Sequence, residues 1–411
     1  MKYGCIGEHL SHSFSKEIHN LLADYPYEIH EVERSKLDYF MIERDFLGIN
    51  VTIPYKELVI PHLYYIDDAA KRIGAVNTIV NRDGKLYGYN TDFYGMSELI
   101  AHSGVTISGN CVAILGTGGT AKTAHAVCEA LGASEIVSVS REARDGVIDY
   151  AALSNIGDRI DVIINTTPVG MYPSIYSTPV SLDDFPNLSG VIDAIYNPLR
   201  SMLVASAKER GIAAEGGLYM LVAQAVRASE IFLGESFSDG TLESVYERTL
   251  KSKENIVLIG MPASGKSTVG KMLAKLLGRE LVDTDSVIVD KTGMEISAIF
   301  ASKGEAEFRN METDAVLDVS RKTALVIATG GGAILKEQNV KALRGNGRLF
   351  FLDRPLEMLI PTESRPLASS IDAIKARYNE RYTIYTETAD ERIDGSISAE
   401  KIAQIIGEKY R

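Results

Sequence analysis

Short apolar runs alternate with longer segments of helical periodicity along most of this chain. Runs rich in Val, Ile and Leu occur at 111–115, 135–139 and 255–259, and each is short enough to be one buried strand. After the first run, apolar residues recur at helical spacing as far as about Leu131. A strand, a helix and a second strand in this order form a βαβ unit, whose strands are parallel. The pattern therefore predicts βαβ units throughout the chain and a doubly wound α/β fold.

The same reading adds further elements and a domain boundary. Apolar runs at 159–164 and 190–193 predict two more strands, and a helix is expected from Gly217 to about Gly234. A polar helical segment, then residues 251–254, precede the strand at 255–259. We place the boundary there, with a linker of about five to ten residues that spans at most roughly 3.5 Å per residue. A length of 411 residues fits two or three domains.

Two glycine-rich loops of different types each follow a predicted strand. Gly116-Thr-Gly118-Gly-Thr-Ala121 fits G-x-G-x-x-[GA], a pattern that places the pyrophosphate of a dinucleotide at a helix N-terminus. Gly260-Met-Pro-Ala-Ser-Gly265-Lys266-Ser267 fits G-x-x-x-x-G-K-[ST], whose backbone N–H groups surround phosphates while the lysine and the hydroxyl reach phosphate oxygens and Mg²⁺. A chain that handles both a dinucleotide and a triphosphate is most simply a fusion of two enzymes.

Composition limits the classes of partner. Hydrophobic residues make up 45% of the chain and charged residues 24%, as in globular proteins. No apolar run approaches the ~18 residues of a membrane span, and the first residues lack the apolar core of a signal peptide. A net charge of −12 argues against a nucleic-acid surface. We therefore expect a cytoplasmic protein with small-molecule substrates, no nucleic acid and no membrane; the oligomeric state stays open, a homo-oligomer included.

Cysteine and histidine usage separates the two parts of the chain. Cys5, Cys111 and Cys128 match neither a zinc ligand set nor a disulfide framework, so we expect reduced, mostly buried thiols. All seven histidines lie at or before His125. The C-terminal part must therefore work with Asp, Glu, Lys, Arg and hydroxyl groups, which suit phosphoryl transfer because that reaction depends on charge neutralisation and positioning.

Four motifs near the N-terminus occur in an order that resembles shikimate dehydrogenase. They are Ser11-His-Ser13-Phe-Ser15, Asn50-Val-Thr52-Ile-Pro-Tyr-Lys56, Gly74-Ala-Val-Asn77-Thr78 and Gly88-Tyr-Asn90-Thr91-Asp92. The resemblance covers about residues 1 to 250 and continues with Asn165-Thr-Thr-Pro-Val-Gly170-Met171, Tyr196-Asn-Pro198 and Gly217-x-x-Met-Leu-Val-x-Gln224. It implies that Lys56 and Asp92 are the catalytic pair. It also implies a shikimate pocket lined by Ser13, Ser15, Thr52, Asn77, Asp92, Tyr196 and Gln224.

Elementary chemistry agrees with this resemblance. Reduction of a ring ketone needs a hydride from one side and a proton for the developing alkoxide, which a lysine held by a carboxylate can deliver. Hydroxyls and amides at Ser13, Ser15, Asn77 and Gln224 suit a polyhydroxylated carboxylate. Taken singly, Lys56 could instead be a solvated lysine after a turn, and Asp92 an N-cap at a helix start.

The resemblance also implies an NADP site. Its cofactor residues are Gly116, Gly118, Gly119, Thr120, Ala121, Ser140, Arg141, Arg144, Thr166, Met171 and Gly217. NAD enzymes usually place an acid on the ribose 2′-hydroxyl, whereas Ser140 and Arg141 match the polar residue and arginine that this family uses for a 2′-phosphate. Glu142 departs from the hydroxyl that the family more often has there, and surface-charge roles for Arg141 and Arg144 would allow NAD. Lys16 replaces a common proline, a change that affects helix entry modestly.

The C-terminal part resembles shikimate kinase over about residues 254 to 411. Its motifs are the second glycine loop, Asp283-Thr-Asp285, Gly304-Glu305-Ala-Glu-Phe308-Arg309-x-x-Glu312, Thr329-Gly330-Gly331-Gly332-Ala333 and Arg365-Pro-Leu367. The resemblance implies that Gly260, Ser264, Gly265, Lys266, Ser267 and Thr268 bind ATP, with Ser267 and Asp283 at Mg²⁺. Lys266, Asp285 and Arg365 would be catalytic: Lys266 on the β/γ-phosphates, Asp285 on the acceptor hydroxyl and Arg365 on the transferring phosphoryl group.

The same resemblance implies a pocket for shikimate. Arg309 and Arg381 would grip the carboxylate through paired hydrogen bonds, and Gly330, Gly331 and Gly332 would let the backbone approach. Arg381 lies in a helical stretch where arginine is usually just solvated. The lid between Leu352 and Arg365 is a few residues short, and Met358-Leu-Ile-Pro361 stands where many relatives carry an arginine against adenine.

Together the motifs predict a bifunctional shikimate-pathway enzyme on three α/β domains. A split α/β substrate domain (1–95, completed by 216–250) and a Rossmann NADP-binding domain (96–215) would precede a P-loop kinase domain with a parallel sheet (251–411). The first part would reduce 3-dehydroshikimate to shikimate and the second would phosphorylate its 3-hydroxyl, towards chorismate and aromatic amino acids. Alternatives are quinate use with NAD, a sensor that binds shikimate-like molecules without turnover, and a kinase for another small polyol such as gluconate.

Overall fold

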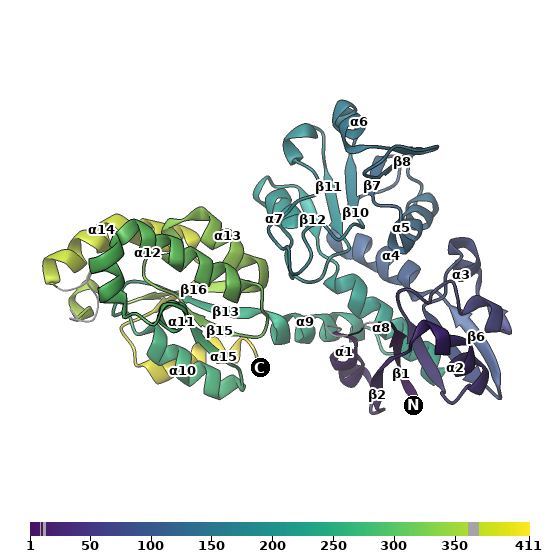
Figure 1. Ribbon diagram of the computed structural model, residues 1–411, viewed down its shortest axis with the longest axis horizontal. Helices are drawn as coiled ribbons and strands as arrows, with labels where there is room; N and C mark the ends of the chain where they lie inside the picture. The colour runs from purple at the N-terminus through teal and green to yellow at the C-terminus, as the bar shows by residue number, and fades with distance from the viewer. Residues whose placement is uncertain (9, 11–13, 361–369) are drawn as a thin grey trace. The chain divides into compact units, whose positions relative to one another are not determined.

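The computed structural model describes residues 1–8, 10, 14–360 and 370–411. Contacts within the chain divide it into two compact units, 1–250 and 251–411 (Figure 1). The first unit holds two six-stranded sheets and the second holds one sheet of five strands. Each unit is described by itself below.

The first sheet of unit 1 is mixed. Its strand order is β2-β1-β3-β5-β6-β4, where β1 (Tyr3–Gly7), β2 (Tyr27–Glu31) and β3 (Gly48–Val51) are parallel. Strands β5 (Thr78–Arg82) and β6 (Lys85–Tyr89) form an antiparallel hairpin, and β4 (Tyr65–Ile66) is an edge strand. The expectation of parallel βαβ units throughout is wrong here. Asp83 and Gly84 both have positive φ (52° and 77°) and close the two-residue turn that such a hairpin requires.

Helices cover this first sheet and connect it to the second. They are α1 (Ser15–Leu22), η1 (Arg34–Lys36), α2 (Leu37–Glu43), η2 (Ile60–His62), α3 (Asp68–Ile73) and α4 (Thr91–Ser103). The long apolar helix α8 (Leu218–Leu233) returns from far along the chain and packs against α1 and α4. Gly95 is why α4 and α8 approach closely, because a Cβ there would lie 2.6 Å from Gln224 Cγ. The predicted boundary at 95/96 falls within α4.

The second sheet of unit 1 is parallel. Its order is β12-β11-β10-β7-β8-β9, with β7 (Cys111–Leu115), β8 (Glu135–Val139), β9 (Val147–Ile148), β10 (Val162–Asn165), β11 (Gly190–Asp193) and β12 (Ala213–Glu215). Around it lie α5 (Gly119–Ala130), α6 (Tyr150–Asn155), η3 (Gly157–Arg159), η4 (Leu182–Asp184) and α7 (Met202–Glu209). The strands expected at 111–115, 135–139 and 190–193 are confirmed. The strand expected from 159 begins at Val162, because η3 occupies the residues before it.

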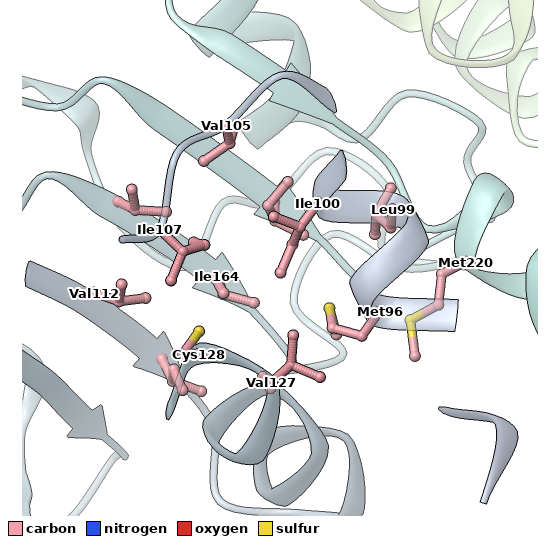
Figure 2. Packing of buried hydrophobic residues seen from close by; sticks show 14 of the residues in the cluster. Met96, Leu99, Ile100, Val105, Ile107, Val112, Val127, Cys128, Ile164 and Met220 are labelled. Carbon is pink, nitrogen blue, oxygen red and sulfur yellow. The ribbon is translucent and has the colours of Figure 1, made fainter. Parts of the chain in front are cut away.

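Alternate residues of each strand enter two separate cores, as a sheet covered on both faces requires. Val112 and Ile114 of β7 pack with α4, α5 and α8, whereas Ala113 and Leu115 pack with α6 and α7. Figure 2 shows the first core, where Met96, Leu99 and Ile100 of α4 meet Val127 and Cys128 of α5 over Val112 and Ile164. All three cysteines of the chain are buried and free.

Unit 2 is a three-layer α/β domain with a parallel sheet of order β14-β15-β13-β16-β17. The strands are β13 (Asn255–Ile259), β14 (Leu281–Asp283), β15 (Val326–Ala328), β16 (Gly347–Asp353) and β17 (Glu391–Asp394). In Figure 1, α10 (Lys266–Leu277) and α15 (Ala399–Glu408) lie on one side of the sheet, and α12 (Ile296–Ser320) and α13 (Glu337–Asn346) on the other. The remaining helices are α11 (Thr284–Thr292), η5 (Ala333–Leu335), η6 (Leu356–Met358) and α14 (Ile371–Thr388).

The segment that joins the units is more helical than expected. Helix α9 (Thr241–Lys253) includes three of the four residues 251–254 at which the boundary was predicted, and β13 begins at Asn255. Glu254 is therefore the one residue between α9 and β13. Arg279 donates to the Glu254 carbonyl at 2.7 Å and so fixes that residue to unit 2.

One carboxyl group of the second sheet is fully buried. Asp193, the last residue of β11, is 0% exposed, and burial raises its pKa to about 6. Its hydrogen-bond partners are the Ser201 hydroxyl (2.5 Å), the Asn165 amide (3.0 Å) and the Ile195 N–H (3.1 Å), all neutral. A folded-state pKa above the unfolded value of 3.8 means that Asp193 favours folding below pH 3.8 and loses this contribution as pH rises through about 6.

Asp193→Asn is therefore expected to stabilise unit 1 above pH 6, on the order of 1–3 kcal/mol. The amide removes the buried charge and its oxygen keeps the contacts with Asn165 and Ile195, although its NH2 group can no longer accept from the Ser201 hydroxyl. The gain should shrink as pH falls towards 4. Urea unfolding followed by hydrogen exchange of peptides around 190–210 measures it. Asp161→Asn, at a partly exposed carboxylate of the same sheet, is the control; equal pH dependence in both variants would contradict the expectation.

Candidate functional site

An ion pair lies where β3 and the β6–α4 turn meet. Lys56 Nζ donates to Asp92 Oδ2 at 2.6 Å, and the two side chains are 24% and 10% exposed. Asp92 is in the first turn of α4, but the N-cap is Asn90, whose side chain accepts from Phe93 N. Lys56 is therefore not a freely solvated lysine, and Asp92 is not the N-cap of α4. A pair that is partly buried but open to solvent can hold a proton and pass it to a ligand.

Asn77 lies beside this pair in a web of hydrogen bonds. Its Oδ1 accepts from Thr91 N (2.8 Å) and Thr78 Oγ1 (3.1 Å), and its Nδ2 donates to Thr91 Oγ1 (3.1 Å). The carbonyl oxygen is thus held by donors of the chain, which sets the orientation of the amide. The group left to face a ligand is the second N–H of Nδ2. The Val76 N–H donates to Lys56 O at 2.8 Å and ties this segment to the lysine.

The other predicted substrate residues come from several elements. Thr52 follows β3, Ser15 begins α1, and Gln224 lies on the α8 face that meets α4. Tyr196 packs edge-to-face on Phe14 at 5.4 Å, and burial raises its pKa. Ser13 lies outside the described residues. The packing of α8 against α1 and α4 thus brings residues from distant parts of the sequence close together.

A buried polar network behind this region was not predicted. His19 stacks on Tyr27 at 3.8 Å between ring centroids, and its Nδ1 lies 2.7 Å from Tyr25 Oη. Tyr27 Oη donates to Asn50 Oδ1 at 2.7 Å, and Asn50 Nδ2 donates to Thr78 Oγ1 at 3.1 Å. Burial lowers the pKa of His19 to about 3, so the ring is neutral. The network connects α1 to β5, the strand that follows Asn77. The pattern of polar and apolar residues along β2 and β3 did not indicate this network.

The first glycine loop joins β7 to α5. Gly116 has φ 109°, and a Cβ there would lie 2.7 Å from Thr166 Oγ1, so only glycine fits beside that threonine. Gly118 is the N-cap of α5, and Gly119, Thr120 and Ala121 form its first turn. Their free N–H groups and the helix dipole suit a pyrophosphate. The loop therefore fits the dinucleotide that the sequence predicts.

The remaining predicted cofactor residues lie around the same edge. Arg141 and Arg144 are exposed after β8, where Ser140 Oγ donates to Glu142 O at 2.5 Å. Met171 is 43% exposed on the turn that follows Thr166. Gly217 is crowded, because a Cβ would lie 2.2 Å from Ala194 O. Gly217 is thus required for packing, a reason separate from cofactor contact.

The second glycine loop wraps its own lysine. Gly260 (φ 149°), Ala263 (φ 66°) and Gly265 (φ 93°) turn the backbone between β13 and α10. Lys266, 5% exposed, donates to the carbonyls of Gly260 (2.7 Å) and Met261 (2.9 Å) inside the loop. Ser264 is buried there, and Thr268 is in the first turn of α10. This is the arrangement that receives nucleotide phosphates.

A hydroxyl and a carboxylate meet at the start of α10. Ser267 Oγ donates to Asp283 Oδ2 at 2.7 Å, and the other oxygen of Asp283 caps α11 by accepting from Asp285 N at 3.0 Å. Two hard oxygen ligands beside a phosphate loop fit Mg²⁺. Asp285 projects from the first turn of α11 towards Gly330, where a Cβ would lie 2.8 Å from its Oδ1.

Arg309 lies in a tight polar pocket on α12. Its NH1 donates to Glu312 Oε2 at 2.7 Å and its NH2 to Glu305 Oε1 at 3.1 Å. A Cβ on Gly332 would lie 2.0 Å from NH1, so glycine is required for the guanidinium to fit. Glu312 is 1% exposed, burial raises its pKa, and its Oε1 has no hydrogen-bond partner among the described residues. Glu312 was part of a motif but was not predicted as a site residue.

Arg381 is 2% exposed, contrary to the solvated role that its helical context favoured. Its NH1 donates to Gly331 O at 3.1 Å, while its Nε lacks a hydrogen-bond partner in the described part of the chain. The buried Tyr385, one turn on along α14, donates from Oη to Gly331 O (2.5 Å) or Gly260 O (2.9 Å). This tyrosine joins both glycine-bearing loops and was also missed. Arg365 and the lid around it lie outside the described residues.

Comparison with known proteins identifies relatives for both units. Residues 5–79 match the family model of the shikimate dehydrogenase substrate-binding domain, and residues 262–411 match that of shikimate kinase. An NADP⁺-dependent shikimate dehydrogenase of Clostridium beijerinckii is 40% identical over 268 residues, which are 61% of this chain and 99% of the relative. That of Methanosphaera stadtmanae is 34% identical over 58% of this chain and 94% of its own.

The solved structures that are similar to this chain include shikimate dehydrogenases. A chorismate mutase/shikimate 5-dehydrogenase fusion protein from Clostridium acetobutylicum is similar with TM-score 0.56 and 37% identity, over 60% of this chain and 95% of the other. Shikimate 5-dehydrogenase from Thermus thermophilus, in complex with NADP(H) and shikimate, gives TM-score 0.55 and 26% identity over 61% and 99%. None of the helices in the described ranges combines the length and apolar character that a membrane crossing requires.

Tyr385→Phe tests the connection between the two loops of unit 2. Removal of the hydroxyl takes away one hydrogen bond shared by the Gly331 and Gly260 carbonyls, which keep Arg381 NH1 and Lys266 Nζ as donors, so unit 2 is expected to lose about 0.5–1.5 kcal/mol of stability. Looser loops should also weaken nucleotide binding, measured by calorimetry with a non-hydrolysable triphosphate. Tyr382→Phe, on the same helix with an outward hydroxyl bound to Asp353 at 3.2 Å, is the control. Equal binding by both variants would show that the connection is not needed.

Proposed function

The chain belongs to the shikimate dehydrogenase family and carries a shikimate kinase domain behind it, and from this we propose how its residues reduce 3-dehydroshikimate and then phosphorylate shikimate. The observation that carries the proposal is the pairing of two sites on one polypeptide. The Lys56–Asp92 ion pair lies in unit 1, and the phosphate loop with the Arg309–Glu312–Arg381 pocket lies in unit 2. NADPH is the reductant of the first reaction, and ATP with Mg²⁺ serves the second.

Lys56 supplies the proton of the first reaction. NADPH provides the hydride to the ring ketone, which leaves negative charge on its oxygen. The Lys56 ammonium, held by Asp92 at 2.6 Å, donates a proton to that oxygen, and the Asp92 carboxylate keeps the ammonium in position. In the reverse direction, the neutral amine takes the proton from the alcohol.

Neutral polar groups orient the ring. The free N–H of Asn77 Nδ2 faces a hydroxyl oxygen of the substrate, because its carbonyl oxygen is already satisfied. Ser15, Thr52 and Gln224 add hydroxyl and amide contacts, and Tyr196 and Ser13 complete the predicted set of substrate-binding residues. A site built from paired polar groups rejects analogues that lack the matching hydroxyl.

The cofactor lies along the carboxyl edge of the second sheet. Gly116 and the first turn of α5 hold the pyrophosphate, and Arg141 with Ser140 and Arg144 takes the 2′-phosphate. Thr166, Met171 and Gly217 shape the nicotinamide end. We assign residues 1–95 and 216–250 to the substrate domain, 96–215 to the NADP domain and 251–411 to the kinase domain.

The second reaction depends on charge placement in unit 2. Lys266 and the N–H groups of the 260–268 loop neutralise the phosphates, Ser267 and Asp283 hold Mg²⁺, and Asp285 orients the acceptor hydroxyl as its base. Arg365 completes the charge neutralisation from the lid. We also place the enzyme in the cytoplasm, where both NADPH and ATP are supplied.

Two arginines bind the substrate carboxylate. Glu312 fixes Arg309 through NH1, so the guanidinium is ordered before a ligand arrives. Arg381 lies beside Gly331, and its Nε has no hydrogen-bond partner among the described residues; the Glu380 carboxylate is 3.8 Å away. An unpaired donor that is buried costs free energy unless a ligand satisfies it. This supports a planar anion as the group that binds between the two arginines.

The full chain should convert 3-dehydroshikimate, NADPH, ATP and Mg²⁺ into shikimate 3-phosphate. Loss of NADPH absorbance and mass spectrometry of the products measure this. Lys56→Ala should lower reduction ~100-fold or more but still phosphorylate added shikimate, whereas Asp285→Asn should stop at shikimate. Each variant is the folding control for the other. Near-normal reduction by Lys56→Ala, or phosphate product from Asp285→Asn, would refute the assigned roles.

Arg141→Ala tests cofactor choice. The loss of a charge-assisted contact to the 2′-phosphate should raise KM for NADPH ~10- to 100-fold, with KM for NADH unchanged, because NADH lacks that phosphate. Steady-state kinetics with both cofactors measure the change. Arg159→Ala removes an exposed arginine of the same domain that pairs with Glu135 at 2.7 Å, and it is the control. Parallel changes for NADPH and NADH would contradict this role of Arg141.

A further inference from the structure

Asp193 joins two loops at the carboxyl edge of the second sheet. One of its oxygens, Oδ1, accepts from Asn165 Nδ2 (3.0 Å) and Ile195 N (3.1 Å), and the other accepts from Ser201 Oγ (2.5 Å). These partners come from the end of β10, the turn after β11 and the N-cap of α7. A single carboxyl group therefore fixes three chain segments that are separate in sequence.

The first arm leads to the turn of residues 166–171. Asn165 is 0% exposed, and its Oδ1 accepts from Thr167 N (3.0 Å) and Thr167 Oγ1 (2.7 Å). Because Nδ2 faces Asp193, both ends of this amide are committed and its orientation is fixed. The turn that it holds begins with Thr166, whose Oγ1 donates to Leu115 O at 2.6 Å beside Gly116. Asp193 thus sets the backbone next to the dinucleotide loop.

The second arm leads to Tyr196. Both backbone polar groups of Ile195 are hydrogen-bonded: its N–H donates to Asp193, and its carbonyl accepts from Gly217 N at 2.8 Å. Tyr196 follows directly and packs on Phe14 of the α1 entry. The two turns are also tied to each other, because Ala194 N donates to Asn165 O (2.9 Å) and Tyr172 N to Asn197 O (2.9 Å).

The cost of this arrangement points away from a role in stability alone. The partners of Asp193 are neutral, and burial raises the pKa of its carboxyl to about 6. An ionised carboxylate without a cation is an expensive group to bury. An amide of the same shape would avoid this cost, but its NH2 group could not accept from the Ser201 hydroxyl, so only a carboxyl accepts from all three donors. The strict geometry that the carboxyl imposes on both turns is what remains to explain its presence.

We propose that Asp193 is a positioning residue for hydride transfer. It acts through Asn165 on the turn of residues 166–171 and through Ile195 on Tyr196, and so holds both in the positions that the transfer requires. The proposal rests on the dehydrogenase function proposed above. Asp193 acts on the geometry of the reacting groups, so its loss slows the transfer step itself. Misplacement by about 1 Å can cost on the order of 100-fold in rate.

The test compares Asp193→Ala, Asp193→Asn and Asp161→Ala in the full chain. Asp161 lies at the amino end of β10 and accepts from Cys111 N at 2.8 Å, so its truncation also removes a carboxylate contact of this sheet, at the opposite edge. Stopped-flow single turnovers of NADPH and NADPD with 3-dehydroshikimate measure hydride transfer and its isotope effect. Phosphorylation of added shikimate by unit 2 standardises the amount of protein.

Asp193→Ala is expected to slow single-turnover transfer ~10- to 100-fold with a full isotope effect. Asp193→Asn is expected to stay within about 3-fold of wild type, because its amide oxygen keeps the contacts with Asn165 and Ile195 that form the two arms. Asp161→Ala should lower thermal stability and leave the transfer rate unchanged. A normal transfer rate in Asp193→Ala overturns the proposal. Equal slowing in Asp193→Asn also overturns it, since charge and not placement would then matter.

A second variant covers failure of Asp193→Ala to fold. Thr167→Val removes the hydroxyl that Asn165 Oδ1 accepts and keeps the side-chain shape. It should slow transfer several-fold with unchanged melting, and an unchanged rate would overturn the Asn165 arm. If the wild-type chain itself fails to oxidise NADPH with 3-dehydroshikimate, the proposed function is wrong. Activity in wild type with normal rates in all variants refutes only the positioning role.

Discussion

The requirement that buried polar groups find partners organises every functional region of this chain. An unpaired buried donor or acceptor costs on the order of 1–3 kcal/mol, and the described residues meet this requirement closely around Asn77, Asp193 and Ser267. Among the described residues it is not met at Glu312 Oε1 and Arg381 Nε, which lie on residues beside the 330–332 loop, nor at atoms elsewhere such as Asn197 Oδ1 and Asn339 Oδ1. The same rule thus explains rigidity in one place and readiness for an anion in another.

The two units reach their chemistry by different electrostatic means. In the roles proposed above, unit 1 uses one ion pair, Lys56–Asp92, that is still partly open to solvent and passes a proton as a carbonyl becomes an alcohol. Unit 2 has no histidine or cysteine and surrounds its ligands with fixed positive groups, among them Lys266, Arg309 and Arg381. Proton transfer needs a group that changes charge, whereas phosphoryl transfer needs charges that stay in place.

Both units place these groups at the carboxyl edges of parallel strands, and the glycines there explain how the chain can approach so closely. Gly116 stands against Thr166 and Gly332 against the Arg309 guanidinium, where any side chain would collide. The antiparallel β5–β6 hairpin does not break this arrangement. It turns at Asp83-Gly84 and returns the chain to α4, so that Asn77 and Asp92 flank the same edge of the first sheet.

Local patterns predicted the elements and the nucleotide loops because those signals are contained within a few residues. The strands at 111–115 and 255–259 and the helix between Gly217 and Gly234 follow directly from apolar runs and glycine ends. Asp83-Gly84 is a hairpin signal in the sequence that the prediction of parallel strands did not take into account. By contrast, burial of Arg381 depends on Gly331, 50 residues earlier in the chain, and the contact of His19 with Ser229 spans 210 residues. Tyr385 and Glu312 gain their roles only once two loops meet. A polar residue that is buried by distant segments has no local periodicity to mark it, so this part of the site becomes visible only when the chain is folded.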